Sequence, residues 1–247
     1  MFYMPPCRGY YIFTFSMTTG YLINIEGPSG SGKSTIGQAL QEILLYRHEL
    51  KVKHFDDWLG ATSVGQHIKS FISSDKNFDL DSLSYTLMLD AAKLQFIREV
   101  AYPLTQDGTH VITECLYDTL FVNMGSLGTL EDYLNEAANM RHNSGLYERP
   151  DITVITTMIG MAEDRLGEAN DKSFPDPLEG FGWDMRRQAV QAWEERIGAV
   201  KRDLQNTPDK ALVVYPTRDS VITDGRWRLD AIADAVKNRA IASLKQE

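Results

Sequence analysis

This chain contains few cysteines. It has no excess of basic over acidic residues and no long run of apolar residues. Its two cysteines among 247 residues, Cys7 and Cys115, make neither a disulfide framework nor a zinc site, so a reducing, cytoplasmic compartment is expected. The net charge of −9 argues against binding of nucleic acid over a broad basic surface. A local basic cleft remains compatible with this overall charge. No apolar stretch approaches the length that spans a bilayer, so no membrane partner is expected.

What remains is the composition of a globular enzyme. With 43% hydrophobic residues the chain can bury one core, alone or with an inserted lid. Residues 1–16 are rich in aromatic side chains but lack the basic lead, long apolar core and cleavage site of a signal peptide. We assign this extension no role and expect the folded domain at residues 17–247.

The most informative segment runs from Gly27 to Ser34, where G-P-S-G-S-G-K-S matches the phosphate-binding pattern G-x-x-x-x-G-K-[ST]. A short apolar run precedes it and a helical pattern follows. Inward-pointing N–H groups and the helix N-terminus hold an anion such as a triphosphate. We expect Lys33 to reach the outer phosphates and the Ser34 hydroxyl to bind Mg²⁺. The predicted nucleotide-binding residues are Gly27, Pro28, Ser29, Gly30, Ser31, Gly32, Lys33, Ser34 and Thr35.

Strand and helix signals alternate along the rest of the chain. Apolar residues recur every three or four positions over residues 83–104, which predicts a long helix with one buried stripe. The stripe residues are Leu83, Leu87, Ala91, Leu94, Ile97, Ala101 and Leu104. A final helix is expected from about residue 227. This alternation predicts a three-layer α/β/α sandwich with a parallel sheet of about five strands, the P-loop nucleoside triphosphate hydrolase fold. The predicted strands cover residues 21–25, 51–55, 109–113, 152–158 and 211–215.

Acidic residues follow two of these strands, at the sheet edge where ligands bind. Phosphoryl transfer needs alignment, Mg²⁺ and cations rather than covalent chemistry from the protein. Glu114 is a candidate to order Mg²⁺ or to accept a hydrogen bond from the substrate, with a solvated carboxylate as the alternative. Asp56 and Asp57 are candidates for contact with the metal or the acceptor hydroxyl, with turn capping as the alternative.

A polar segment at residues 163–187, punctuated by glycine and proline, is a candidate lid. Such a lid closes over the phosphates, excludes water and supplies positive charge at the transition state. The alternative is a solvated loop whose cations pair with neighbouring carboxylates. The candidate lid cations are Arg165, Lys172, Arg186 and Arg187.

Taken in order, these segments resemble the thymidylate kinase family from about Thr19 to the C-terminus. The resemblance implies ATP and Mg²⁺ as cofactors, a small-molecule nucleotide as acceptor, and a homodimer formed through the long helices. It is carried by the segments Ile25–Gly27, Val64–Lys69, Val111–Glu114 and Pro150–Thr153, and by Trp193 where the family often has tyrosine.

The departures from the family concern the acceptor side. The family's Asp-Arg-Tyr/His motif is replaced by Glu114–Leu116, so the arginine that would hold the acceptor's phosphate is absent. Its Arg-Glu-Pro segment is replaced by Phe55–Trp58. Our alignment puts Asp90 and Leu94 where the long helix normally carries a phenylalanine and an arginine near thymine. Recognition of thymine is therefore not carried over.

The leading interpretation is an ATP- and Mg²⁺-dependent kinase that phosphorylates a deoxynucleoside monophosphate. A second interpretation keeps the donor site but changes the acceptor to a nucleoside or a hydroxylated modified base in DNA, which fits the missing arginine. A third is a nucleotide-binding switch module without transferase activity. The choice between adenine and guanine in the donor stays open.

Overall fold

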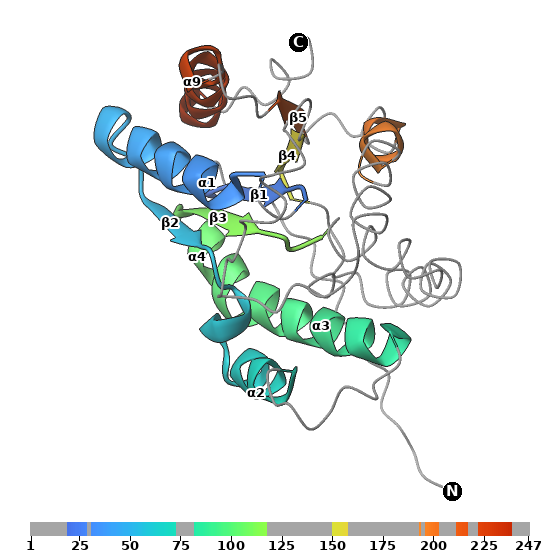
Figure 1. The fold of residues 1–247 in the computed structure, drawn as a ribbon. Helices are drawn as coiled ribbons and strands as arrows, with labels where there is room; N and C mark the ends of the chain where they lie inside the picture. Colours follow the sequence, from blue (N-terminus) through green and yellow to red (C-terminus); the bar gives the residue numbers. More distant parts are fainter. Residues whose placement is uncertain are drawn as a thin grey trace, which may run out of the picture.

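A parallel sheet forms the centre of the protein in the computed structural model (Figure 1). Its five strands lie in the order β2-β3-β1-β4-β5. They are β1 (Leu22–Glu26), β2 (Val52–Phe55), β3 (His110–Glu114), β4 (Ile152–Thr157) and β5 (Ala211–Pro216). The structure describes residues 19–28, 31–72, 82–117, 150–157, 193, 196–202, 211–216 and 222–238.

All four strand pairings are parallel, because a helix or a long connection separates consecutive strands. The central strand β1 pairs Ile23 with Ile112 of β3 on one side and with Ile152 of β4 on the other. The prediction of a parallel sheet of about five strands is confirmed.

Helices cover both faces of this sheet (Figure 1). The helices α1 and α9 pack on one face, while α2, α3 and α4 lie on the other. A π-helical segment, Ile97–Ala101, joins α3 to α4. The helix bounds are α1 Lys33–Glu42, α2 Ser63–Ile72, α3 Ser82–Phe96, α4 Tyr102–Gln106 and α9 Ile222–Asn238.

Each face of the sheet has its own apolar core, which makes the three-layer sandwich. Ile23 and Ile25 of β1 pack with Leu40 of α1 and Ile232 of α9. On the opposite face the buried apolar residues are Trp58, Leu59, Ile72, Leu89, Ala92, Phe96, Ala101, Val111, Leu116 and Tyr117. Burial of such side chains contributes about 1.5–3 kcal/mol each, so these two clusters supply the main stabilisation of the layers.

The buried face of the long helical segment agrees with the expected stripe only in part, for example at Ala101, which is buried. We expected Ala91 and Leu94 on its buried stripe, but Ala91 is exposed and Leu94 is only half-buried. Leu89 and Phe96 are buried instead, together with the charged residue Lys93. The physical reason is that Lys93 has a buried carboxylate partner on the same helix, described below.

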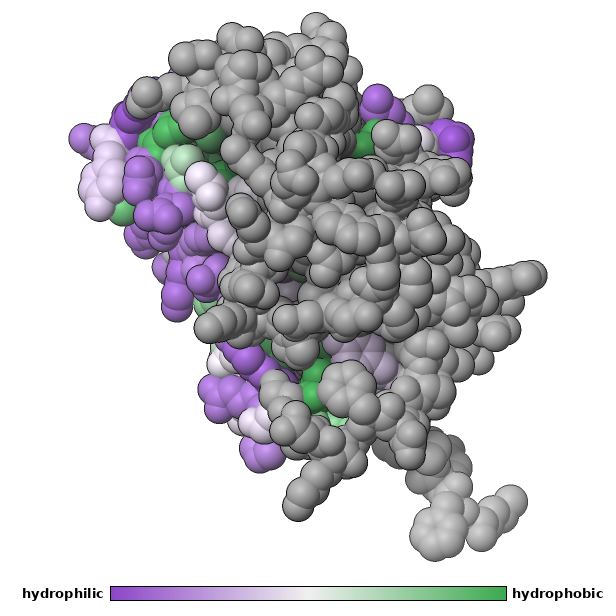
Figure 2. Space-filling model, viewed as in Figure 1, coloured by the Kyte–Doolittle hydropathy of each residue, from purple (hydrophilic) through white to green (hydrophobic). Residues whose placement is uncertain are grey.

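Along the left side of Figure 2, where described residues are visible, hydrophilic residues predominate and some apolar residues lie between them. Among the helices that the structure describes, none has both the length and the apolarity that crossing a bilayer requires. Several sequence predictions lie outside the described residues. They are the extension at residues 1–16, the lid at residues 163–187 with all four of its candidate cations, and Ser29 and Gly30 of the phosphate-binding loop.

Candidate active site

The phosphate-binding loop joins the end of β1 to the start of α1. Gly27 and Gly32 have φ angles of 143° and 83°, in the left-handed region that favours glycine. Gly32 is the N-cap of α1 and makes no side-chain capping bond. The first N–H groups of a helix have no partner within it, so this end of α1 presents donors and partial positive charge to an anion. Ser34 and Thr35 are exposed in this first turn.

The loop is tied to the neighbouring strand β4 by hydroxyl groups. The Ser31 hydroxyl bonds to that of Thr156, which in turn donates to the Glu26 carbonyl at 3.0 Å. A Cβ atom on Gly27 would lie 2.0 Å from Thr156 Oγ1, so the loop packs against β4 too closely for any side chain. The geometry of the loop is therefore set partly by a strand about 130 residues further along the chain.

This close packing makes a specific prediction for two glycine variants. Gly27→Ala is expected to lower the free energy of unfolding by more than about 1 kcal/mol, because strain at φ 143° adds to the clash with Thr156. Gly32→Ala, with nothing within 4 Å of its Cβ, meets only the backbone strain and is expected to cost less. Urea denaturation of both variants measures the difference. Equal losses would contradict the packing argument.

Lys33 reaches across the loop. Its ammonium group donates to the carbonyl oxygens of Gly27 at 3.0 Å and Pro28 at 2.9 Å. Lys33 is also the first residue of α1. These two hydrogen bonds keep the positive charge at the loop that is expected to hold a polyphosphate.

Glu114, at the end of β3, faces the start of α1. The Ser34 hydroxyl donates to Glu114 Oε2 at 2.7 Å, so the structure brings the two predicted metal-binding residues together. The other carboxylate oxygen, Oε1, lies 2.8 Å from Nε2 of His54 on β2. The Glu114 side chain is only 6% exposed. Sequence analysis did not single out His54, because a lone histidine inside a strand pattern carries no spacing signal.

Asp56 and Asp57 lie in the turn after β2 and are engaged in that turn. Asp56 Oδ1 accepts from the Asp57 N–H at 2.9 Å. Asp57 accepts from the Gly60 N–H at 3.2 Å and forms a 2.7 Å ion pair with Lys69 of α2. These contacts match the capping alternative and fasten α2 to the end of β2. A contact of either carboxylate with metal or acceptor stays a prediction.

A buried charged group on α3 was missed by the sequence analysis. Lys93 and Asp90 form an ion pair in which the two side chains are 0% and 1% exposed. The Lys93 ammonium lies 5.3 Å from the centre of the Tyr117 ring, and the Tyr117 N–H donates to Glu26 at 2.6 Å. We call Glu26, Asp90, Lys93 and Tyr117 the α3 charge cluster. Its sequence signal was the i, i+3 spacing of opposite charges inside an apolar helix.

The two residues that follow Glu114, Cys115 and Leu116, differ in how deeply they are buried. Cys115 has a φ angle of 55° and is half-buried, while Leu116 is fully buried in the core beneath α3. These are the positions at which the resemblance led us to look for an arginine and an aromatic or histidine side chain. Neither of these two residues carries a positive charge, so neither can form an ionic contact with an acceptor phosphate.

Comparison with known proteins decides the family. The thymidylate kinase family model matches residues 25–174, which include the end of β1, the phosphate-binding loop and the strands β2 to β4. The chain belongs to the thymidylate kinase family. It is accordingly a P-loop nucleoside monophosphate kinase, as the resemblance led us to expect.

Individual relatives agree with this assignment. The chain is 26% identical to a thymidylate kinase of Roseiflexus castenholzii over 236 residues, covering 91% of this chain and 95% of the relative. It is 30% identical to a thymidylate kinase of Neisseria gonorrhoeae over 153 residues, covering 61% and 71%. The crystal structure of a thymidylate kinase from Ehrlichia chaffeensis is similar in fold, with a TM-score of 0.56 at 17% identity, covering 87% of this chain and 98% of that one.

Proposed function

We propose that this kinase transfers the γ-phosphate of ATP to a deoxynucleoside monophosphate, with Mg²⁺ as cofactor. The observation that carries the proposal is the contact of Ser34 with Glu114 at the N-terminus of α1, together with the Lys33 ammonium on the Gly27 carbonyl of the same loop. These three side chains come from the helix and the strand that meet at the ligand-binding edge of the sheet. We propose the cytoplasm as the compartment of this protein, because two widely separated cysteines suit a reducing environment.

The donor set at this edge fits Mg²⁺. A hydroxyl and a carboxylate are hard oxygen ligands, and Mg²⁺ binds through one or two protein groups plus substrate phosphates. Ser34 and Glu114 would hold the ion, which supplies charge neutralisation across the transferring phosphates when bound. Ser34 is exposed while Glu114 is nearly buried, so the hydroxyl faces the nucleotide and the carboxylate orients it from behind.

The other residues of the chain would align and neutralise the nucleotide. The N–H groups of the loop and of the first turn of α1 bind phosphate oxygens, and Lys33 leaves the Gly27 and Pro28 carbonyls for the outer phosphates. Asp57 and Lys69 hold the turn after β2 in place. The candidate lid cations Arg165, Lys172, Arg186 and Arg187 would supply further positive charge during transfer.

The residues expected to bind the phosphate acceptor also fit a second candidate function, in which the acceptor is not a nucleoside monophosphate. Cys115 and Leu116 offer no cation for an acceptor phosphate, which also fits a nucleoside or a hydroxylated base in DNA. The α3 charge cluster places Lys93 near the residue that follows this turn, so a cation is present on α3 instead. The Lys93 ammonium could bind the phosphate of an acceptor only if its ion pair with Asp90 opens.

An acceptor panel with labelled ATP tests both candidates. The panel contains the deoxynucleoside monophosphates, the matching nucleosides and DNA with hydroxymethylated bases, each with Mg²⁺ and with EDTA. We expect Mg²⁺-dependent transfer to at least one monophosphate and none in EDTA. Product only on nucleosides or modified DNA supports the second candidate. Binding of ATP with no product on any acceptor contradicts both and supports a switch module.

A further inference from the structure

We propose that His54 is a positioning residue for the metal-binding pair, holding Glu114 so that its second oxygen stays on Ser34. The inference rests on the proposed Mg²⁺-ATP function and adds a residue from a third element, β2. No role in contacting the substrate is assigned to His54. It acts through the carboxylate.

The two oxygens of Glu114 have separate partners. Oε2 accepts from the Ser34 hydroxyl at 2.7 Å, and Oε1 lies 2.8 Å from His54 Nε2. A carboxylate oxygen accepts hydrogen bonds, so the histidine tautomer that fits this contact has its proton on Nε2, which donates. The His54 and Glu114 side chains are 10% and 6% exposed, so little water competes for this bond.

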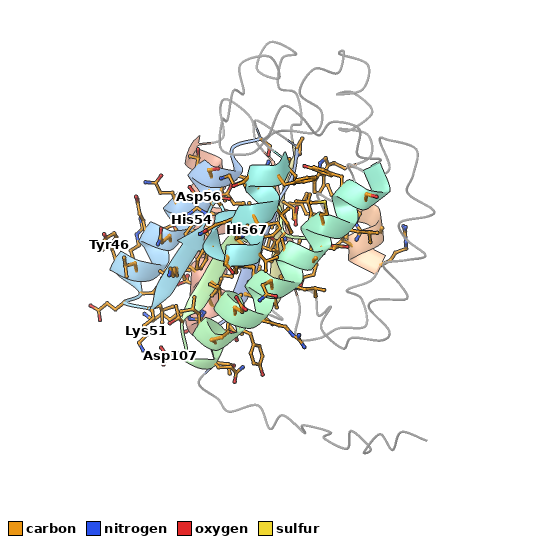
Figure 3. All side chains as sticks on the ribbon, turned by 90° about the horizontal axis from the view of Figure 1, so that it is seen from below. Tyr46, Lys51, His54, Asp56, His67 and Asp107 are labelled. Carbon is orange, nitrogen blue, oxygen red and sulfur yellow. The ribbon has the colours of Figure 1, made fainter. Side chains whose placement is uncertain are left out.

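The backbone places His54 for this contact. In the register of β2 with β3, His54 lies opposite Ile112, two residues before Glu114 on the adjacent strand. Strand residues two apart share a face of the sheet, so His54 and Glu114 point to the side that α1 covers. Figure 3 shows His54 on β2, next to the labelled Asp56 near the end of the strand.

Gly37 of α1 makes the space for the imidazole. A Cβ atom at this position would lie 2.5 Å from His54 Nε2 and 3.3 Å from Glu114 Oε1. Gly37 has no positive φ angle, so the helix does not need glycine for its backbone conformation. Glycine inside a helix is unfavourable relative to alanine. The absence of a side chain is explained by the histidine that fills the space.

The expected effect follows from how ligand carboxylates are held. Loss of an outer partner of a metal ligand typically lowers metal affinity or activity by about 10–100-fold. Without His54, the Glu114 carboxylate can rotate away from Ser34, and the hydroxyl loses the acceptor that orients its lone pairs. The loss falls on binding that depends on Mg²⁺ and spares the contacts of the loop amides with ATP alone.

Calorimetric titration of the full chain with ATP, in Mg²⁺ and in EDTA, tests the proposal. His54→Leu is expected to weaken binding of ATP in Mg²⁺ by about 10–100-fold and to leave binding in EDTA unchanged. His54→Gln, which keeps an N–H near the position of Nε2, is expected to recover most of the affinity. His67→Gln is the matched control, because His67 is exposed on α2 and, among the described residues, bonds to the Ser63 carbonyl of its own helix.

Gly37→Ala gives an independent arm that removes no hydrogen-bonding group. The added methyl displaces the imidazole, so the same Mg²⁺-specific loss is expected. Gly198→Ala is its control, since the nearest atom to that Cβ is 3.6 Å away. The proposal is overturned if the His54→Leu and Gly37→Ala variants lose the same ATP affinity in Mg²⁺ as in EDTA. It is also overturned if both variants keep the full affinity for ATP in Mg²⁺. If the wild-type protein binds ATP with Mg²⁺ but phosphorylates no acceptor, the proposed function fails while this comparison still decides the role of His54.

Discussion

Replacing Lys33 with alanine is expected to lower the rate of phosphoryl transfer by about 10²–10³-fold or more. The ammonium group lies across the phosphate-binding loop, and removal of one preorganised group that stabilises developing charge typically has this cost. Steady-state rates with the best acceptor of the panel measure the loss. The free energy of unfolding should change little, because the side chain is only half-buried.

The control for this variant is Lys51→Ala. Lys51 forms a 3.5 Å ion pair with Asp107 in which both side chains are about 70% exposed, and such pairs contribute little. Wild-type activity is therefore expected for Lys51→Ala. Activity of Lys33→Ala within a few-fold of wild type would remove Lys33 from the mechanism and leave the loop as a binding element only.

The second large effect is expected at the α3 charge cluster. Lys93→Ala leaves the Asp90 carboxylate buried without the cation that it now contacts. Breaking a buried ion pair by removing one partner typically costs about 3–5 kcal/mol. Chemical denaturation should show a loss of this size in the free energy of unfolding, and a loss below about 1 kcal/mol would contradict the argument.

The double variant Asp90→Leu, Lys93→Met separates stability from function. Apolar residues of similar volume often replace a buried ion pair with no loss of stability or with a gain. A stable double variant with a raised KM for the acceptor and an unchanged KM for ATP would show that the pair serves the acceptor side. Unchanged values for both would make the pair purely structural.

Much of the fold was predictable from sequence because its signals are local. β1, the phosphate-binding loop and α1 form one continuous segment in which glycine spacing, apolar run and helical pattern agree. The strands β3, β4 and β5 are short apolar runs bounded by turn residues, and each lies within about two residues of its predicted position.

The buried face of α3 was not predictable in the same way. The helix contains so many apolar residues that more than one stripe fits a spacing of three or four, and the stripe through Ala91 and Leu94 was as regular as the one through Leu89 and Phe96. The deciding feature is the buried pair of Lys93 with Asp90. The Lys93 ammonium lies 5.3 Å from the centre of the Tyr117 ring in the turn after β3, a neighbour that no pattern within the helix contains.

The sequence by itself determined the anion-binding loop, the parallel α/β order and the candidates Lys33, Ser34 and Glu114, because each depends on neighbours in the chain. Only the tertiary structure decided that Ser34 meets Glu114 across 80 residues and that His54 meets Glu114 across 60. These contacts depend on which strands lie side by side and which helix covers them. That arrangement is set by packing of the two cores and by strand register, which are properties of the whole chain.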